Sequence, residues 1–343
     1  MVTLSDADYL RLIIHGATAF ELVHAALQLD LFEALEQHGA MSVADAAKVL
    51  HIDEQPARIL LLGLASMRLL EATPPLYRNT PLVRRKLLRA SDTFLGPLID
   101  VQSAIINAAM PAFTDALRTN TNVGLHRTAG AHGTLYEWLG AQPELQRTFY
   151  ANMGDVSRRT FAQILDRYDF SNLRVAVDFG GGDATNAIEL ARRFPHLHVR
   201  VFDAPAVREV AEQRIAQAGL SDRVTFHGGD LFADPLPAGA DAVLVFHVFE
   251  IWSMARNTEL LRRCHAALAD GGVCLVYNFV SSDDGTGPLG AGLLSPYFLT
   301  LASGEGMVYS AADMERAVLD AGFSGTERHT DFGFGHALVV GRR

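Results

Sequence analysis

Cysteine is scarce in this chain: Cys264 and Cys274 are the only two among 343 residues. Two cysteines cannot build the disulfide framework of a secreted protein, so we expect a reducing, cytoplasmic location. Long apolar runs are also missing. No stretch of about 18 apolar residues occurs, which predicts no transmembrane helix. Asp6, Asp8 and Arg11 interrupt the beginning of the sequence, so we expect no signal peptide.

Positive charge is the second shortage. The chain has 29 Lys and Arg against 39 Asp and Glu, which gives a formal net charge of −10. Contacts to phosphate groups need Lys and Arg, so neither nucleic acid nor an anionic membrane is an expected partner. His, Cys and acidic residues are not spaced as metal ligands, so we predict no metal site.

The richest segment of the chain is Arg174–Leu190, RVAVDFGGGDATNAIEL. Its pattern predicts a buried strand that ends at Asp178, a glycine turn, and a helix from about Thr185. Glycines such as Gly180 and Gly182 let a ligand approach the backbone, and the helix N-terminus behind them offers free N–H groups. A nucleotide-like ligand fits such a turn. The glycine spacing departs from the dinucleotide fingerprint, so it favours S-adenosylmethionine over NAD.

Two more acidic residues follow apolar strands. Asp203 ends the second strand, 25 residues after Asp178, where a carboxylate can accept both ribose hydroxyls. A third strand, residues 223–227, precedes Asp230 and Leu231, which are placed to contact adenine. Asp230 alone would equally suit a turn or a helix cap. Three acids at three successive strand ends favour a cofactor site.

The first 95 residues predict helices and one two-stranded ribbon at residues 71–80, which is a winged-helix pattern. DNA binding is the obvious function of such a pattern. Residues 1–90, however, hold nine Lys and Arg against ten Asp and Glu, so we do not expect it. The apolar surface of residues 10–35 predicts contact with a second subunit instead.

From residue 172 onward, strands and helices alternate, which predicts an α/β fold with a doubly wound, mostly parallel, Rossmann-like sheet. Residues 335–340 and 327–332 are expected to pair at its edge. Residues 119–133 predict a loop that lies over a ligand. We therefore divide the chain into a dimerisation domain (1–95), a helical linker and lid (96–165) and a catalytic domain (166–343).

Together, the stretches DFGGG, FDAP, GGDLF and LVFHVFEIW resemble the dimeric S-adenosylmethionine-dependent O-methyltransferases of plant phenolics and bacterial polyketides. The resemblance covers nearly the whole chain. It implies an N-terminal winged-helix dimerisation domain, a homodimer, and a small aromatic substrate. It also implies cofactor contacts at Gly180, Asp203, Asp230, Leu231 and Trp252, and a cofactor–substrate boundary at Phe149 and Met153.

The chain departs from this family at the positions of the family's catalytic residues. Glu250 stands where the family usually has a catalytic histidine, and Ile251 where it has an aspartate. The supporting glutamates of the family correspond to Asn278 and Val308. The resemblance therefore implies the scaffold and leaves the reaction open. Methylation of a phenolic oxygen is favoured on family grounds. Methylation of a ring carbon is the alternative, as is hydroxylation, decarboxylation or rearrangement on the same scaffold.

Five side chains are candidates for the chemistry. Burial among apolar neighbours should raise the pKa of Glu250, making it a base for a phenol, although it could instead bind a substrate amine or hydroxyl, or cap a helix. His247 is the alternative base, and it shares a face with Glu250 if the segment is helical. Asn278, Tyr297 and Tyr309 are expected to contact the substrate, or, for the tyrosines, simply to pack.

Overall fold

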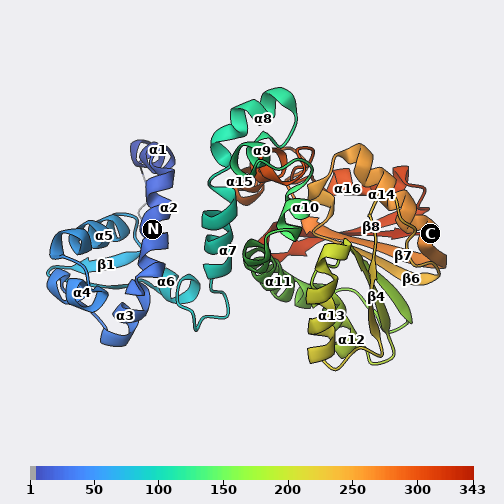
Figure 1. Cartoon of the computed structure of the whole chain (residues 1–343), viewed down its shortest axis with the longest axis horizontal. Helices are drawn as coiled ribbons and strands as arrows, with labels where there is room; N and C mark the ends of the chain where they lie inside the picture. The colour runs from blue at the N-terminus through green and yellow to red at the C-terminus, as the bar shows by residue number, and fades with distance from the viewer. Residues whose placement is uncertain (1–4) are drawn as a thin grey trace. The chain divides into compact units, whose positions relative to one another are not determined.

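The computed structural model describes residues 5–343, apart from the side chains of residues 331 and 334. Contacts divide the chain into two units, Met1–Ser103 and Ala104–Arg343, which are described separately (Figure 1). The three-part division made from the sequence stays a prediction. Its first boundary, after residue 95, lies before the end of the first unit.

The first unit consists of short helices and one antiparallel ribbon. Residues 6–14 and 16–28 form two helices that meet at 71°. Ser42 begins a helix with a capping box, as its sequence indicates. The elements are α1 (Asp6–Ile14), α2 (Gly16–Gln28), α3 (Leu31–His38), α4 (Val43–Leu50), α5 (Glu54–Ser66), β1 (Leu70–Thr73), β2 (Leu76–Asn79), α6 (Pro81–Lys86) and α7 (Gly96–Val101).

The core of this unit lies between α2, α3, α4 and α5, where leucines such as Leu31, Leu35 and Leu64 are buried. By contrast, α1 has no buried residue, and Leu10, Ile13 and Ile14 are exposed. In the part of the chain that the structure describes, no single helix is long and apolar enough to cross a membrane. The bent pair α1 and α2 passes that test jointly, on length and composition alone.

The second unit is built on the predicted sheet. Seven strands lie in the order β5-β4-β3-β6-β7-β9-β8, and the first five are parallel. The last two, β9 and β8, are antiparallel to their neighbours and form the edge that the sequence indicates. The strands are β3 (Val175–Phe179), β4 (His198–Asp203), β5 (Val224–Gly228), β6 (Ala240–Phe246), β7 (Leu268–Phe279), β8 (Gly325–Phe332) and β9 (His336–Arg342).

Helices cover both faces of this sheet (Figure 1). One core packs α12 (Thr185–Arg193), α13 (Arg208–Gln217) and the end of α11 (Pro143–Leu165) on one face. The other packs α14 (Met254–Ala267) and α16 (Ala311–Asp320) on the opposite face. The doubly wound α/β fold is therefore confirmed.

The segment before the sheet corrects one expectation. The predicted loop over residues 119–133 contains a helix, α9 (Val123–Ala129), which follows α8 (Phe113–Thr119). Asn120 ends α8 in the left-handed conformation, so the chain can turn and start again within three residues. Helix α9 packs against η5 (Phe298–Ala302), which continues α15 (Leu289–Tyr297). The close approach of the Gly124 Cα to the Thr300 carbonyl leaves no room for a Cβ.

Candidate active site

The glycine turn is tightly enclosed. Gly180 and Gly182 have φ angles of +72° and +53°, which favour glycine. A Cβ on Gly180 would lie 2.5 Å from Cγ2 of Val248, and one on Gly181 would lie 2.6 Å from Oδ2 of Asp178. The turn needs glycines because Val248, two residues beyond the end of β6, and the buried Asp178 lie directly against it. Helix α12 then starts at Thr185, as predicted.

Two carboxylates flank this turn. Asp203 ends β4, and its Oδ2 accepts the Gly182 N–H at 2.7 Å while its Oδ1 accepts the Ala204 N–H at 2.6 Å. Asp178 is buried, and its Oδ2 has no hydrogen-bond partner in the described chain. Burial, reinforced by the charges of Asp203 and Asp183, raises the pKa of Asp178 to about 7. An acid in this state is suited to a ligand that brings positive charge or donors.

Asp230, the third of these acids, forms the turn that the sequence analysis gave as the alternative to a cofactor contact. Asp230 is exposed, and its Oδ1 accepts the N–H groups of Phe232 at 2.7 Å and Ala233 at 3.2 Å. This is a turn-type arrangement. Leu231 beside it is half-buried. Contact of Asp230 and Leu231 with adenine stays a prediction.

Trp252 lies in an ordered stack of side chains. The guanidinium of Arg256 is 4.5 Å from the Trp252 ring and 3.7 Å from the Phe232 ring, and the two rings meet edge to face at 4.9 Å. Glu305 holds Arg256 by an ion pair at 3.0 Å. The indole Nε1 of Trp252 is buried and donates no hydrogen bond within the described residues. It is a free donor for a ligand.

Glu250 is the most unusual side chain in the site. It lies on the short helix η4 (Phe249–Ile251), only 4% exposed, and its Oε2 has no partner among the described residues. Burial raises its pKa to about 8, and its own backbone N–H opposes this only weakly. Among the residues that the structure describes, no cationic side chain contributes to this pKa. With this pKa the Glu250 carboxyl group is mostly protonated in the ligand-free site at pH 7, and it can act as a base once it is ionised.

Other unpartnered polar groups lie on the elements around η4. Asn278, at the end of β7, is buried with neither side-chain atom hydrogen-bonded in the described chain. The hydroxyls of Tyr297 and Thr300, from α15 and η5, are likewise without a full hydrogen bond there. Helix η4 contacts both β7 and η5. Buried polar groups are nearly always satisfied, so this concentration indicates a place for a polar ligand.

Sequence reasoning missed two tyrosines beside the predicted Phe149 and Met153. Phe149 is buried, and its ring meets Tyr136 at 5.8 Å and Tyr150 at 5.6 Å, both edge to face. Tyr150 lies 3.1 Å from the position a Cβ would take on Gly182. Met153, one helical turn further, is half-buried. The capping box at Thr134 begins α10 (Leu135–Gly140) and places Tyr136 in its first turn. This box is the sequence signal from which the helix could have been predicted.

The structure separates His247 from Glu250. The shared helical face does not form, because His247 has a φ of +55° and η4 begins only at Phe249. The imidazole is buried, with its Nε2 3.1 Å from Nε2 of His336. Burial and His336 lower the pKa of His247 well below its usual value, and Glu250 does not contribute. A catalytic role for His247 stays a prediction without this pairing.

Tyr309 also has a backbone partner. Its hydroxyl donates to the Trp252 carbonyl oxygen at 2.9 Å, and burial raises its pKa to about 12. This bond holds the Tyr309 side chain against Trp252, and contact of Tyr309 with the substrate stays a prediction. Val308, where the family has a glutamate, is completely buried.

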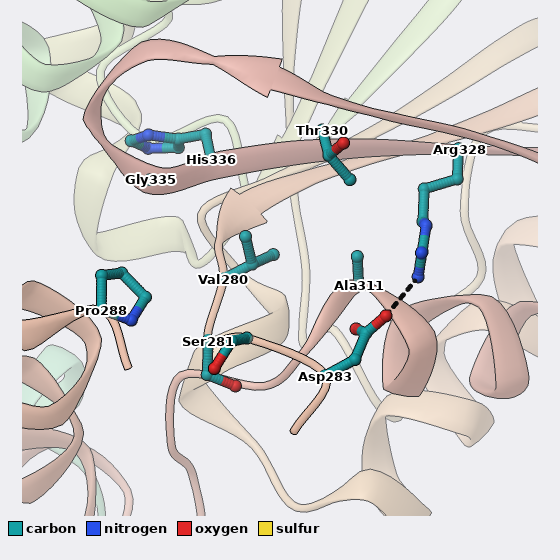
Figure 2. Close-up of a pocket in the computed structure, with 10 residues that line it drawn as sticks. Val280, Ser281, Asp283, Pro288, Ala311, Arg328, Thr330, Gly335 and His336 are labelled. Atoms are coloured by element: carbon teal, nitrogen blue, oxygen red, sulfur yellow. Dashed lines mark hydrogen bonds and ion pairs between the residues drawn. The ribbon is translucent and has the colours of Figure 1, made fainter. Parts of the chain in front are cut away.

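A cavity of about 260 Å³ lies elsewhere, between the ends of β7, β8 and β9 (Figure 2). It contains no residue of the glycine turn or of η4. Arg328 points across it to Asp283 at 2.9 Å, so these two charges satisfy each other. Among the side chains that the structure describes, no three His, Cys, Asp or Glu residues gather to hold a metal ion.

Comparison with known proteins identifies the scaffold. The sequence profile of an O-methyltransferase domain matches residues 112–324, and that of an O-methyltransferase dimerisation domain matches residues 12–88. The chain belongs to the O-methyltransferase family. It is therefore an S-adenosylmethionine-dependent methyltransferase with a dimerisation domain. The cofactor inferred from the glycine spacing is confirmed.

Three relatives are informative for this methyltransferase. It is 35% identical over 320 residues to the L-tyrosine C(3)-methyltransferase of Streptomyces lavendulae, covering 93% of this chain and 87% of the relative. It is 33% identical over 309 residues to the 3-hydroxy-5-methyl-1-naphthoate 3-O-methyltransferase of Streptomyces sahachiroi, covering 90% and 87%. The apo crystal structure of the S-adenosylmethionine-dependent methyltransferase SibL superposes with a TM-score of 0.81 at 36% identity, covering 98% of both chains.

The residues present fit S-adenosylmethionine. The glycine turn would be filled by any Cβ, and the carboxylate of Asp203 lies at the end of the neighbouring strand. The unpartnered Oδ2 of Asp178 and Nε1 of Trp252 supply an acceptor and a donor. Which of these groups contact the cofactor stays a prediction.

Proposed function

We propose that this enzyme methylates a small phenolic metabolite of specialised biosynthesis, with Glu250 as the base. The observation that carries the proposal is the buried Oε2 of Glu250, unpartnered in the described chain, together with the unpartnered polar groups of Asn278, Tyr297 and Thr300 on β7, α15 and η5, of which β7 and η5 contact η4. A phenol brings an O–H to donate and an oxygen to accept. It therefore satisfies groups that would otherwise be costly to bury.

The relatives support a phenolic substrate. The names of the two curated relatives specify L-tyrosine in one case and a hydroxynaphthoate in the other. Both molecules combine an aromatic ring with a hydroxyl group.

The proposed division of labour follows from the site. Asp178, Gly180, Gly182, Asp203, Asp230, Leu231 and Trp252 hold S-adenosylmethionine, which supplies a methyl group on a sulfonium. The chain aligns the acceptor and removes its proton. A free phenol has a pKa of about 10. Transfer of its proton to Glu250, which has a pKa of about 8, is unfavourable by about 3 kcal/mol. A cost of this size is compatible with general-base catalysis in the enzyme–substrate complex.

The acceptor atom has two candidates. The family as a whole favours the phenolic oxygen. The 35% identity with an L-tyrosine C(3)-methyltransferase favours the ring carbon beside the hydroxyl. The same base serves both, because a phenolate carries its negative charge on oxygen and on the ortho carbons.

The test combines binding and product analysis. Calorimetry should show binding of S-adenosylmethionine and its demethylated product to the wild type and to Glu250→Gln, but not to Asp203→Ala. With S-adenosylmethionine, L-tyrosine and 3-hydroxy-1-naphthoate are offered as acceptors, and mass spectrometry detects a gain of one methyl group. Glu250→Gln should lower kcat at least ~100-fold at unchanged cofactor affinity. Retention of most of the rate would remove Glu250 as the base.

We also propose that the enzyme is a homodimer in the cytoplasm. The dimerisation domain and the exposed Leu10, Ile13 and Ile14 on α1 support a subunit interface. Cys264 and Cys274 are free thiols, which suits a reducing compartment. Light scattering after size exclusion should give twice the chain mass, and Ile13→Glu should shift it toward the monomer. A monomeric wild type would contradict the dimer.

A further inference from the structure

A row of aromatic side chains joins the glycine turn to Glu250. Tyr150 lies against Gly182, Phe149 lies edge-on between Tyr150 and Tyr136, and Tyr136 reaches the surroundings of Glu250. Helix α10, which bears Tyr136, packs on α11, on η5, and on η3 (Pro205–Val207). The row therefore spans the distance from the cofactor turn to the proposed base.

Helix α10 is held firmly at both ends. Thr134 and Glu137 form a reciprocal capping box at its start. At its last residue, a Cβ on Gly140 would lie 3.1 Å from the Cβ of Ala206, directly after the strand that ends in Asp203. Tyr136 is thus held in a fixed position next to the segment that follows Asp203.

The hydroxyls of Tyr136 and Tyr297 interact with each other, without the geometry of a full hydrogen bond, and both are close enough to Glu250 to be affected by its charge. Tyr150 is a further ionisable group near Tyr136. Burial and the Glu250 charge raise the pKa of both tyrosines above the usual value, so both remain donors. No hydrogen bond joins either hydroxyl to Oε2 of Glu250 in the described chain. An acceptor oxygen placed between them meets one carboxylate and two donors.

We propose that the Tyr136–Tyr297 pair holds the phenolic oxygen of the acceptor and thereby directs the methyl group to the adjacent ring carbon. The proposal rests on the phenolic substrate argued above. It makes the two tyrosines specificity-determining residues, and Tyr136 was not foreseen from the sequence.

The chemical reason is that the oxygen and the ortho carbon of the same phenolate compete for the methyl group. An oxygen that accepts two hydrogen bonds is a weaker nucleophile, whereas the ortho carbon makes no such bonds and keeps its reactivity. Glu250 takes the hydroxyl proton, the new carbon–carbon bond forms as the carbon–sulfur bond breaks, and that electron pair stays on sulfur. The ring proton at the methylated carbon then passes to water, and the oxygen recovers its proton from Glu250. One proton is released for each methyl transferred.

The experiment compares Tyr136→Phe and Tyr297→Phe with the wild type, and Tyr168→Phe is the matched control. Phenylalanine keeps the ring packing, and Tyr168 is a half-buried tyrosine packed on Phe170, away from the site. With L-tyrosine and 3-hydroxy-1-naphthoate as acceptors, tandem mass spectrometry gives the ratio of carbon- to oxygen-methylated product. Loss of one hydrogen bond should lower this ratio about tenfold in each site variant and leave it unchanged in the control.

A second readout needs no turnover. 4-Nitrophenol is bound to the protein loaded with S-adenosylhomocysteine, and its ionisation is followed by absorbance. The pair should stabilise the bound anion, so the pKa of the probe should be about one unit higher in Tyr136→Phe and Tyr297→Phe than in wild type.

The outcomes separate this proposal from the one before it. If no phenol gains a methyl group, the proposed function fails, and the 4-nitrophenol titration still decides whether the tyrosines hold a phenolic oxygen. If methylation occurs only on oxygen in the wild type, the directing role is overturned. An unchanged product ratio together with an unchanged probe pKa in both site variants overturns it as well.

Discussion

Replacing Glu250 by glutamine should stabilise the ligand-free protein at neutral pH. The carboxyl group is buried without a partner for Oε2 in the described chain, and its pKa is raised from 4.5 to about 8. Between these two values the unfolded chain has lost the proton and the folded chain keeps it. Folding stability therefore falls as pH rises through this window, and glutamine, which does not titrate, escapes the loss.

The magnitude follows from the same values. From 4.5 to pH 7 there are 2.5 pH units, each worth about 1.4 kcal/mol, so ionisation in the unfolded chain costs the wild type ~3.5 kcal/mol of stability. At pH 4 both states hold the proton and this cost is nearly zero. Burial of the glutamine amide has its own cost, about 1–3 kcal/mol, but it is the same at both pH values. The difference between the two measurements isolates the carboxyl group.

The assay is thermal unfolding of both proteins at pH 4 and pH 7, at one protein concentration. For a unit of this size, about 3 kcal/mol corresponds to roughly 6–12 °C, so the gap between variant and wild type should widen by that amount toward pH 7. Glu259→Gln, an exposed carboxylate on α14, is the control and should show no widening. A gap that is equal at the two pH values would refute the buried, proton-holding state of Glu250.

Three further predictions concern the cofactor turn and the base. Asp203→Ala should weaken binding of S-adenosylmethionine ~100-fold or more in calorimetry, because it removes charge-assisted hydrogen bonds to ligand and to Gly182; a threefold change would contradict the assignment. Gly180→Ala should lower stability by about 1–3 kcal/mol in denaturant titration, since its Cβ meets Val248 at positive φ, and full stability would show that the turn adapts. The value of kcat/KM should rise with pH up to about 8 as Glu250 ionises, and a flat profile from pH 6 to 9 would exclude this base.

The sequence was most informative where structure is local. The glycine turn and the carboxylates of Asp178 and Asp203 were predictable because each lies at the end of its own strand or directly after it. The edge pair of β8 and β9 followed from neighbouring apolar patterns in the same way. In parallel sheets such strand ends converge, so local patterns are enough to assemble a site.

The sequence was least informative where one residue redirects the chain or where distant helices meet. The single left-handed residue His247 removed the helical face expected for it and Glu250. Asn120 allowed a helix inside a predicted loop. Tyr136 and Tyr150 lie beside Phe149, and the contact of Tyr136 depends on the packing of α10 on α11, which are separate elements. No periodicity within one segment encodes such contacts.

The hydrogen bond between Asp203 and Gly182 has a consequence for turnover. The Gly182 N–H occupies only one acceptor position of the Asp203 carboxylate, which keeps other lone pairs free while it holds the turn closed. The proposed ribose contact would therefore be made by a carboxylate that is already fixed in place, and binding would not have to order it. The demethylated product carries the same ribose, so this preorganisation would act equally on both forms of the cofactor and leave the methyl group to distinguish them.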